Sequence, residues 1–214
     1  KRQELDFADL ISKSTDILNK TNFKTKFKRI IVDEYQDISR GRYRLLKALI
    51  KKQKDCRIMC VGDDWQSIYG FNGSDIRFTF DFEKVFGKTS RIDLDKSFRF
   101  TQPILDVSSR FIQKNPLQLK KKITSKPSTF KKTIEIIENE FGNQEYLYEV
   151  FKKINTDRPN NKKWDVIILG RYNHLEKEIP DDLKSKYKQL NIKFMSIHKS
   201  KGLGADVVVI LKME

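Results

Sequence analysis

Two adjacent carboxylates directly follow a short apolar run in the first third of the chain. Asp33 and Glu34 come after Ile30-Ile31-Val32, and such a β-branched run predicts a buried parallel strand. A carboxylate at the carboxyl end of a strand can hold Mg²⁺ through water, and its neighbour can orient and deprotonate an attacking water molecule. We therefore expect Asp33 to bind a metal ion and Glu34 to act as a base. The alternative for the pair alone is a solvated strand end.

Aromatic side chains gather in a second segment, downstream of the carboxylates. Trp65, Tyr69 and Phe71 fall within seven residues, and Gly70 and Gly73 lie beside them. The glycines make this segment a poor helix, so we expect a loop. Aromatic faces exposed on a loop can stack on unpaired bases of a nucleic acid. Core packing is the alternative for Tyr69, and for Trp65 it is the interpretation that we prefer.

The charge balance of the chain is strongly basic. Its 214 residues include 44 Lys and Arg against 29 Asp and Glu, which gives a formal net charge of +15. This is typical of a protein that binds a polyanion, although a merely lysine-rich protein is an equal alternative. Hydrophobic residues make up 38% of the chain, enough for a folded core, which excludes a disordered protein.

Cysteine and histidine are scarce. Cys56 and Cys60 are the two cysteines, and the chain has two histidines, so we expect buried thiols and no dedicated cysteine–histidine metal site. No apolar stretch approaches the ~20 residues of a membrane span, and no signal-peptide core follows the first residues. We therefore expect a cytoplasmic protein without a membrane partner.

The elements that would position the chemical side chains alternate between strand and helix. Residues 5–18 have apolar groups at helical spacing, strand 30–32 follows, and residues 42–52 return to a helix before strand 57–61. This order is a βαβ unit. Further strands are predicted in the second half, at Ile134–Ile137, Val166–Leu169, Phe194–Ile197 and Val207–Leu211. Alternating elements predict an α/β fold with a largely parallel sheet.

Two further segments connect these halves. Residues 91–103 are predicted to start as a strand and to end at a helix that opens on Pro103, and we place a domain boundary there. Residues 115–132 contain two prolines and many lysines, which favours an exposed loop.

Several segments resemble, in order, the motifs of the UvrD/Rep family of superfamily 1 DNA helicases. DEYQD and VGDDWQSIYGFNGSD resemble motifs II and III, and LDKSFRF and FMSIHKSKGLGADVVVI resemble motifs IV and V. DFADLI and ILGRYNHL are similar to further segments of the family. The resemblance implies two RecA-like halves of the P-loop NTPase type, the first of them incomplete. We expect residues 1–95 to belong to the first motor domain and residues 96–214 to the second.

The resemblance also implies roles at the nucleotide. Gln66 would sense the γ-phosphate of ATP, and Arg99 would reach the same phosphate from the second domain. A guanidinium there stabilises charge that develops in phosphoryl transfer. Phe98 resembles the aromatic residue that packs on the adenine. The alternative for Gln66 is a glutamine on the surface, and the alternative for Arg99 is a surface salt bridge. For Phe98 the alternative is core packing.

Candidate contacts with DNA follow from the same resemblance. Phe71 takes the position of the family's base-stacking aromatic residue, with Tyr69 and Asn72 beside it. His198 and Lys199, in the segment that resembles motif V, could contact DNA or phosphate. A structural histidine at the end of a strand is the alternative for His198.

A phosphate-binding loop GxxxxGK[ST] is absent from the 214 residues. Gly87-Lys88-Thr89 imitates its last three positions, but Phe82 stands where the first glycine is required, so we expect a turn there. The family's motif VI is also absent. We expect the chain to be truncated at both ends and to hydrolyse no ATP by itself.

The resemblance implies that the intact protein is an ATP-dependent DNA helicase or translocase. It would use ATP and Mg²⁺, act on single-stranded DNA in repair or recombination, and move in the 3′-to-5′ direction. The alternative is a non-catalytic DNA-binding regulatory relative without a phosphate-binding loop. A weaker third alternative is an ATPase that acts on RNA.

Overall fold

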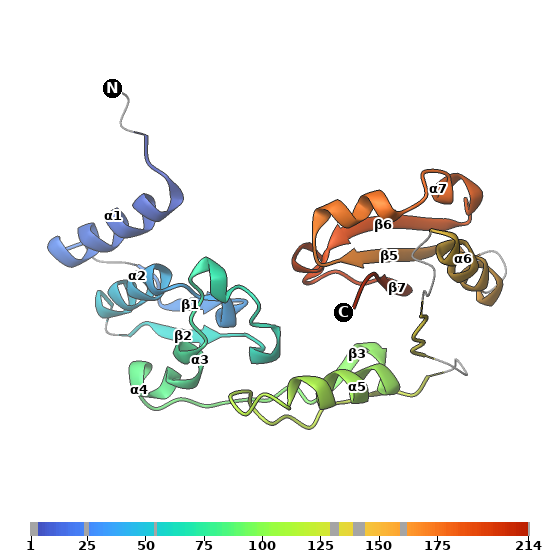
Figure 1. The fold of residues 1–214 in the computed structure, drawn as a ribbon. Coiled ribbons are helices and arrows are strands. Elements are labelled where there is room, and N and C mark those ends of the chain that lie inside the picture. The colour runs from blue at the N-terminus through green and yellow to red at the C-terminus, as the bar shows by residue number, and fades with distance from the viewer. Residues whose placement is uncertain are drawn as a thin grey trace. The chain divides into compact units, whose positions relative to one another are not determined.

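The computed structural model describes residues 4–23, 26–53, 55–128, 133–138, 144–158 and 162–213. The chain forms two compact units, residues 1–126 and residues 127–214 (Figure 1). The boundary that we predict at residue 95 divides the chain between sequence motifs, whereas the compact units meet at residue 126. The boundary between the two motor domains stays a prediction.

The first unit contains the predicted βαβ arrangement. Strand β1 (Arg29–Val32) pairs in parallel with β2 (Arg57–Cys60), so that Val32 lies opposite Cys60, and helix α2 (Arg40–Lys51) connects the two strands. Because the strands are parallel, their carboxyl ends lie at the same edge of the sheet. The residues that follow Val32 and Cys60 are therefore neighbours in space.

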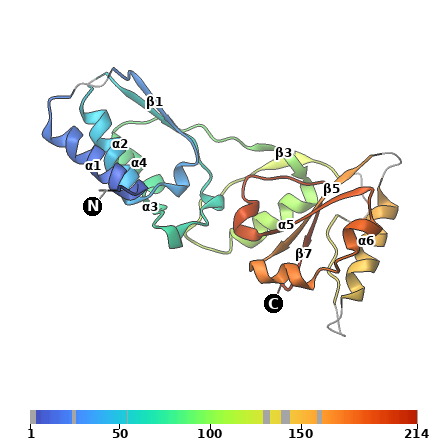
Figure 2. The ribbon, with the colours of Figure 1, turned by 90° about the horizontal axis from the view of Figure 1, so that it is seen from above.

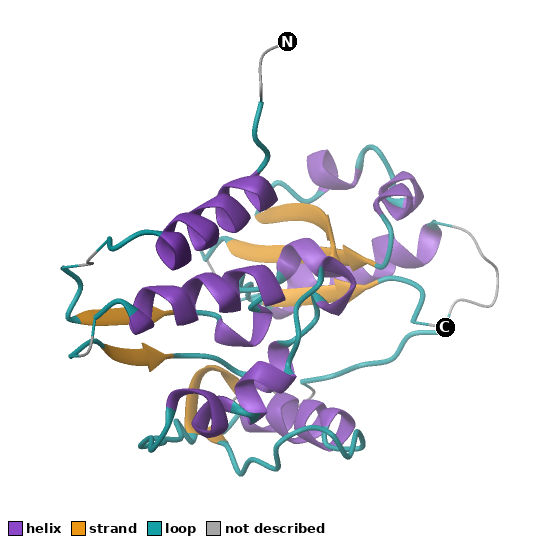
Figure 3. Cartoon of the chain, turned by 90° about the vertical axis from the view of Figure 1, so that its left-hand side faces the viewer, coloured by secondary structure: helices purple, strands orange, loops and turns teal. Residues whose placement is uncertain are grey.

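Helix α1 (Phe7–Lys20) packs along α2, as Figures 2 and 3 show. Its start is fixed by a capping box, in which the Asp6 carboxylate accepts a hydrogen bond of 2.7 Å from the backbone N–H of Asp9. Ser39 caps α2 by accepting from the N–H of Arg42. These local signals explain why both helices could be predicted from the sequence.

A small core lies beneath the carboxyl ends of β1 and β2. Tyr35, Ile38 and Leu46 are buried in it, and the rings of Tyr43 and Phe78 stack at 4.0 Å. Two short helices, α3 (Arg77–Phe80) and α4 (Phe82–Phe86), contribute aromatic side chains to this core. The core holds in place the turn that follows β1.

The remainder of the first unit is a second parallel pair of strands. Strand β3 (Lys96–Thr101) pairs with β4 (Thr124–Lys126), and α5 (Gln102–Ile112) connects them. The predicted helix at Pro103 is confirmed, but the predicted strand begins at Lys96 instead of residue 91. Strand β4 interrupts the predicted loop 115–132, of which residues 129–132 lie outside the described residues.

The second unit is a three-stranded parallel sheet with the order β6-β5-β7 (Figure 1). Its elements are α6 (Glu145–Asp157), β5 (Trp164–Gly170), α7 (Leu183–Lys186), β6 (Leu190–Ser196) and β7 (Val207–Ile210). The middle strand β5 is buried along most of its length, and its side chains pack against Leu147 and Phe151 of α6. This packing supplies the core of the unit.

Two strand predictions in the second half need correction. Ile134–Ile137 forms no strand, and Ile136 is 87% exposed. Strand β6 begins four residues before the predicted Phe194 and ends at Ser196. The predictions at Val166 and Val207 are confirmed. With every strand pair among the described residues parallel, the predicted α/β class is confirmed.

Candidate nucleotide and nucleic-acid site

The two predicted catalytic carboxylates lie at the carboxyl end of β1, and both are exposed. Asp33 Oδ1 accepts a hydrogen bond of 2.8 Å from the backbone N–H of Glu34. Glu34 has a left-handed backbone, with φ 49° and ψ 42°, which non-glycine residues rarely adopt. This conformation turns the chain out of the strand and into the 3₁₀ turn Tyr35–Asp37. Strained backbone of this kind is found preferentially at functional sites.

Gln36 lies in the 3₁₀ turn directly after the two carboxylates, and the sequence alone predicts no role for it. Its side chain is buried, with an exposed fraction of 1%. The amide Nε2 donates to Glu34 Oε2 at 2.5 Å, and Oε1 accepts from the backbone N–H of Asp63 at 3.0 Å. Gln36 thereby connects the residue that follows β1 with a residue that follows β2.

The predicted γ-phosphate sensor, Gln66, lies in the 3₁₀ turn Asp64–Gln66 after β2. Its Nε2 donates to Asp63 Oδ2 at 2.8 Å. Gln66 is half-buried and bonded, so it differs from the freely exposed surface glutamine of the alternative interpretation. Asp63 is thus shared: its backbone contacts Gln36, and its carboxylate contacts Gln66.

Lys121 is a second residue whose place the sequence did not indicate. Its ammonium contacts the carboxylates of Asp63 and Asp64, and it lies 5.2 Å from the ring centroid of Trp65. Burial raises the pKa of Asp63, but hydrogen bonds from Lys121 and Gln66, together with the charge of Lys121, bring the pKa below the ordinary aspartate value. The carboxylate is therefore held in its charged form.

A backbone segment next to Lys121 binds the same turn. Asp64 is buried, and its Oδ2 accepts a hydrogen bond of 2.8 Å from the backbone N–H of Leu119. Trp65 is half-buried, and its indole N–H donates to the carbonyl oxygen of Leu119 at 2.9 Å. These bonds agree with the structural role that we prefer for Trp65.

Three candidate DNA residues lie on the turn that follows. Phe71 is 70% exposed, and its ring centroid lies 6.1 Å from that of Tyr69 in an edge-on arrangement. Tyr69 is half-buried, whereas Asn72 is exposed. Residues 70–72 form a 3₁₀ turn that ends at Gly73, whose φ of 82° suits a glycine. The turn presents Phe71 to solvent, which excludes core packing for this side chain.

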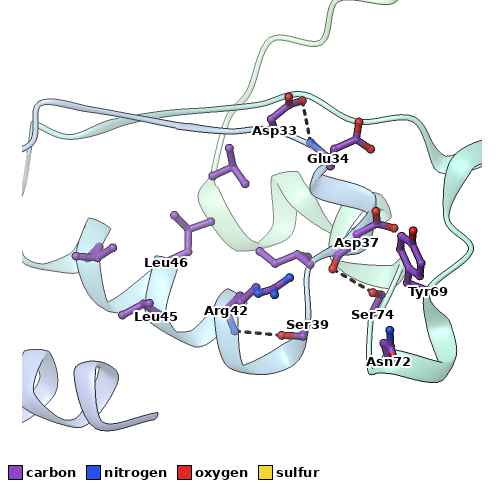
Figure 4. Close-up of a pocket in the computed structure, with 13 residues that line it drawn as sticks. Asp33, Glu34, Asp37, Ser39, Arg42, Leu45, Leu46, Tyr69, Asn72 and Ser74 are labelled. Carbon is purple, nitrogen blue, oxygen red and sulfur yellow. Dashed lines mark hydrogen bonds between the residues drawn. The ribbon is translucent and has the colours of Figure 1, made fainter. Parts of the chain in front are cut away.

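A pocket of about 540 Å³ joins the carboxylates to this turn. Its apolar lining includes Leu45, Leu46 and Leu49 of α2. Its polar lining, drawn in Figure 4, comes from the segment after β1, from the start of α2 and from the turn around residues 70–72, and comprises Asp33, Glu34, Asp37, Ser39, Arg42, Tyr69, Asn72 and Ser74. A pocket with apolar walls and a few convergent polar groups is the usual form of a ligand site. The structure therefore brings Asp33, Glu34, Tyr69 and Asn72 around one cavity.

Phe98 and Arg99 lie on β3, in a different sheet from the carboxylates. Phe98 is 75% exposed, so core packing does not account for it, and Lys96 Nζ lies 5.4 Å from its ring centroid. Arg99 is exposed. The exposed ring of Phe98 could contact a nucleotide base, and the exposed guanidinium of Arg99 could contact a phosphate.

His198 and Lys199 belong to the second unit. They lie in the 3₁₀ turn Ile197–Ser200, directly after β6, and both are exposed. Gly170 of β5 lies opposite Ser196 of β6, so the residues that follow the two strands leave the sheet at one edge. After β5, the rings of Tyr172 and His174 stack at 5.4 Å. Aromatic and basic groups therefore gather at this edge.

Gly87-Lys88-Thr89 is no phosphate-binding loop. Gly87 follows the last residue of α4 with a φ of 85°, and residues 88–95 contain no helix that could present its N–H groups to a phosphate. The structure has a bend at Lys88 and irregular backbone around it, in place of the predicted turn.

The residues that could hold a metal ion are carboxylates at the end of β1. Among the described residues there is no group of three or more His, Cys, Asp or Glu that could hold a metal ion. The exposed carboxylate of Asp33 nevertheless fits Mg²⁺, which takes one or two carboxylates and completes its shell with water and substrate phosphates. Cys56 and Cys60 are half-buried, which corrects the expectation of fully buried thiols, and burial raises the pKa of Cys60 to about 12.

No helix in the described part of the chain is long and apolar enough to cross a membrane.

Comparison with known proteins identifies two consecutive domains. The UvrD/REP helicase N-terminal domain matches residues 1–87, and the UvrD-like helicase C-terminal domain matches residues 92–191. Both are RecA-like folds, in agreement with the short parallel sheets of the structure.

Individual proteins that are similar to this chain are also DNA helicases. DNA helicase IV of Escherichia coli (strain K12) is 37% identical over 210 residues, which are 98% of this chain and 30% of that protein. ATP-dependent DNA helicase PcrA of Staphylococcus aureus (strain Mu50) is 34% identical over 81% of this chain and 24% of its own length. PcrA of Bacillus subtilis (strain 168) is 31% identical over 86% of this chain and 25% of its own length.

The chain thus spans less than a third of each of these relatives. Among the members of the family, the sequences DEYQD and VGDDWQSIYGFNGSD resemble helicase IV in particular. The 37% identity to DNA helicase IV of Escherichia coli agrees with this resemblance. The two domain matches together cover most of the chain, which therefore belongs to the UvrD/Rep helicase family.

Proposed function

We propose that residues 1–214 are part of an ATP-dependent DNA helicase or translocase that moves along single-stranded DNA. The observation that carries the proposal is the hydrogen-bonded path from Glu34 through Gln36 and Asp63 to Gln66. It links a carboxylate suited to act as a base with an amide suited to read a phosphate. The names of the relatives, DNA helicase IV and PcrA, support the same class of enzyme.

In this proposal each side chain has one task in ATP hydrolysis. Asp33 holds Mg²⁺, which neutralises the charge of the phosphates when it is bound. Glu34 orients the attacking water and takes its proton. Gln66 and Arg99 donate hydrogen bonds to the γ-phosphate, and Phe98 packs on the adenine.

The DNA contacts in the proposal use the exposed aromatic and basic groups. Phe71 stacks on an unpaired base, with Tyr69 and Asn72 beside it. His198 and Lys199 bind the DNA backbone from the second unit. The family resemblance also supports movement in the 3′-to-5′ direction and a role in repair or recombination. We further propose that the protein acts in the cytoplasm.

The direct test is the substitution Glu34→Gln in the full-length protein. We expect the turnover of ATP to fall by about 10²–10⁴-fold, because a general base contributes rate enhancement of that order. Binding to single-stranded DNA should be retained. Glutamine keeps the size of the side chain and an oxygen that can accept from Gln36, so the fold should be preserved.

The matched control is Glu83→Gln on α4, which removes the same charge from an exposed position away from the pocket. Its turnover should equal that of the unmodified protein. Retained turnover in Glu34→Gln would contradict the assignment of the base. Absence of DNA-stimulated ATP hydrolysis in the unmodified full-length protein would instead favour the non-catalytic DNA-binding relative.

A further inference from the structure

Gln36 is an uncharged polar side chain that the fold buries at the edge of a candidate catalytic site. Its exposed fraction is 1%, and a buried amide is stable only when its donor and acceptor groups are hydrogen-bonded. The partners differ in kind: Glu34 Oε2 can only accept while it is ionised, and the backbone N–H of Asp63 can only donate. A flipped amide would face oxygen to oxygen, so the orientation is unambiguous.

The surroundings of Gln36 leave little room for another arrangement. A Cβ atom at position 62 would lie 2.7 Å from Gln36 Oε1, so glycine is required there. The backbone N–H of Tyr35 donates to the carbonyl oxygen of Val61 at 2.9 Å, and Ser67 Oγ donates to the carbonyl oxygen of Gln36 at 3.3 Å. The segments that follow β1 and β2 are therefore joined around this one side chain.

The bond to Glu34 fixes the direction of a carboxylate whose backbone is already unusual. Glu34 has the left-handed conformation, and its side chain reaches the pocket shared with Asp33. A base must lie within hydrogen-bonding reach of the proton that it takes, so its orientation matters as much as its chemistry. Gln36 engages Oε2, and a carboxylate has about four acceptor positions on its two oxygens. The bond can therefore orient Glu34 without saturating it.

The other end of Gln36 leads to the second strand. Its Oε1 accepts from the backbone N–H of Asp63, and the carboxylate of Asp63 accepts from Gln66 at 2.8 Å and from the backbone N–H of Trp65 at 3.2 Å. A displacement of Gln36 would therefore disturb both Glu34 and the turn that carries Gln66.

We propose that Gln36 is a positioning residue of the ATPase site, which orients the Glu34 carboxylate and fixes its place relative to Gln66. This proposal rests on the proposed function, because it assumes that Glu34 acts as the base. Gln36 itself touches no substrate. Its contribution is to hold two groups, from two different strand ends, in one arrangement.

The test uses two substitutions in the full-length protein. Gln36→Met keeps the length of the side chain but removes both hydrogen bonds. Gln36→Glu keeps an acceptor for Asp63 but turns a carboxylate oxygen towards Glu34. For each variant we expect kcat for ATP to fall by about 100-fold, the loss that a displacement of about 1 Å can cause, with KM for ATP changed little. Gln144→Glu, at an exposed position of the second unit, is the control and should leave kcat unchanged.

The pH profile separates positioning from a general loss of structure. In Gln36→Glu, two facing carboxylates resist joint ionisation, so the acidic limb of kcat should move to higher pH. Asp33, Asp37 and Arg42 line the same pocket and Asp63 lies on the other side of Gln36, but all four are unchanged in the variants. A double variant that combines Glu34→Gln with Gln36→Glu exchanges the two side chains and so restores one amide and one carboxylate at these positions. It should recover the melting temperature lost in Gln36→Glu but not the turnover.

Three outcomes would overturn the proposal. In the first, both single variants would have the same kcat and the same pH profile as the unmodified protein, which would show that Glu34 needs no positioning by Gln36. In the second, a loss of kcat that follows the loss of melting temperature, with an unmoved acidic limb, would show a purely structural role. In the third, an unmodified protein without ATP turnover would overturn the proposed function and this proposal with it.

Discussion

Phe71 and Phe111 are two phenylalanines of the first unit that expose nearly equal fractions of their surface, 70% and 73%. They differ in surroundings. Phe71 lies on the turn that follows Gln66 and beside Tyr69, whereas Phe111 lies in the last turn of α5. An exposed ring contributes little to folding, so replacing either should leave the stability nearly unchanged. The pair therefore tests stacking on DNA separately from folding.

We expect Phe71→Ala in the full-length protein to weaken binding to single-stranded DNA by about 5- to 150-fold. This range corresponds to the loss of ~1–3 kcal/mol for one stacked base. Fluorescence anisotropy with a labelled oligonucleotide measures the affinity. Phe111→Ala should bind as the unmodified protein does. Equal losses in the two variants, or no loss in Phe71→Ala, would contradict base stacking by Phe71.

At the residue scale the sequence indicates reactive side chains better than it indicates the groups that hold them. Asp33 and Glu34 could be found because they directly follow an apolar run. Gln36 could not, because a glutamine in a polar segment is typical of a surface. Its burial depends on the parallel register of Val32 with Cys60, which places Asp63 above it. That register joins two strands that are separated by residues 33–56, and neither strand alone determines it.

At the element scale, the same distinction between local and non-local signals explains the strand predictions. Strands β1, β2, β5 and β7 were found because each is an apolar run. Only β5 is buried along most of its length, and the prediction of a buried strand at β1 needs correction, because Ile31 is 71% exposed. Ile134–Ile137 has the same composition, but Ile134 is 49% exposed and no sheet pairs with it. A β-branched run forms a strand only when a neighbouring strand satisfies its backbone. Strand β4 is the reverse case, a polar segment that β3 recruits.

The segment between α5 and β4 is joined to the turn after β2 by the ion pairs of Lys121. Lys121 contacts Asp63 and Asp64, and its side chain is 21% exposed. We expect Lys121→Met to destabilise the protein by roughly 1–3 kcal/mol at pH 7, because buried Asp64 and half-buried Asp63 lose a charged partner. Lys122→Met is the matched control, since it removes the same charge from an exposed neighbouring position and should have little effect.

The pH dependence of this difference has a definite sign. The pKa of Asp63 is lowered in the folded protein, so its stabilising contribution is present above the ordinary aspartate pKa of about 3.9 and is lost as the pH falls below it. The gap in melting temperature between the unmodified protein and Lys121→Met should therefore be largest near neutral pH and narrow towards pH 3. A gap that stays constant, or that widens on acidification, would contradict a role for the ion pair.

At the scale of the whole molecule, the net charge of +15 is carried by two units. Each unit has a parallel sheet with functional candidates after its strands: Asp33, Glu34 and Gln66 in the first, His198 and Lys199 in the second. Parallel strands gather such residues at one edge, which is why the α/β class and the placement of these groups follow from the sequence. The extent of the compact units does not follow from the sequence, because it depends on contacts between distant segments, such as those of Lys121 with Asp63 and Asp64.

The absence of a GxxxxGK[ST] sequence from residues 1–214 leads to the last prediction. Without the backbone N–H groups and the lysine of that loop, the purified 214 residues should not hold the phosphates of ATP and should show no turnover. They should still bind single-stranded DNA weakly. If four phosphates are neutralised, the affinity should fall about 50-fold between 50 and 200 mM salt, since the salt slope is about −0.7 per phosphate.

Two measurements check this expectation on the same sample. Anisotropy at several salt concentrations gives the slope, and a coupled assay with single-stranded DNA gives the turnover. The 214-residue protein with Glu34→Gln measures contaminating ATPase, so equal rates in the two samples would mean that residues 1–214 are inactive. A higher rate in the unmodified 214 residues would mean that these residues suffice to hold the phosphates. The pocket lined by Asp33, Glu34 and Arg42 would then be the place to look for the groups that bind them.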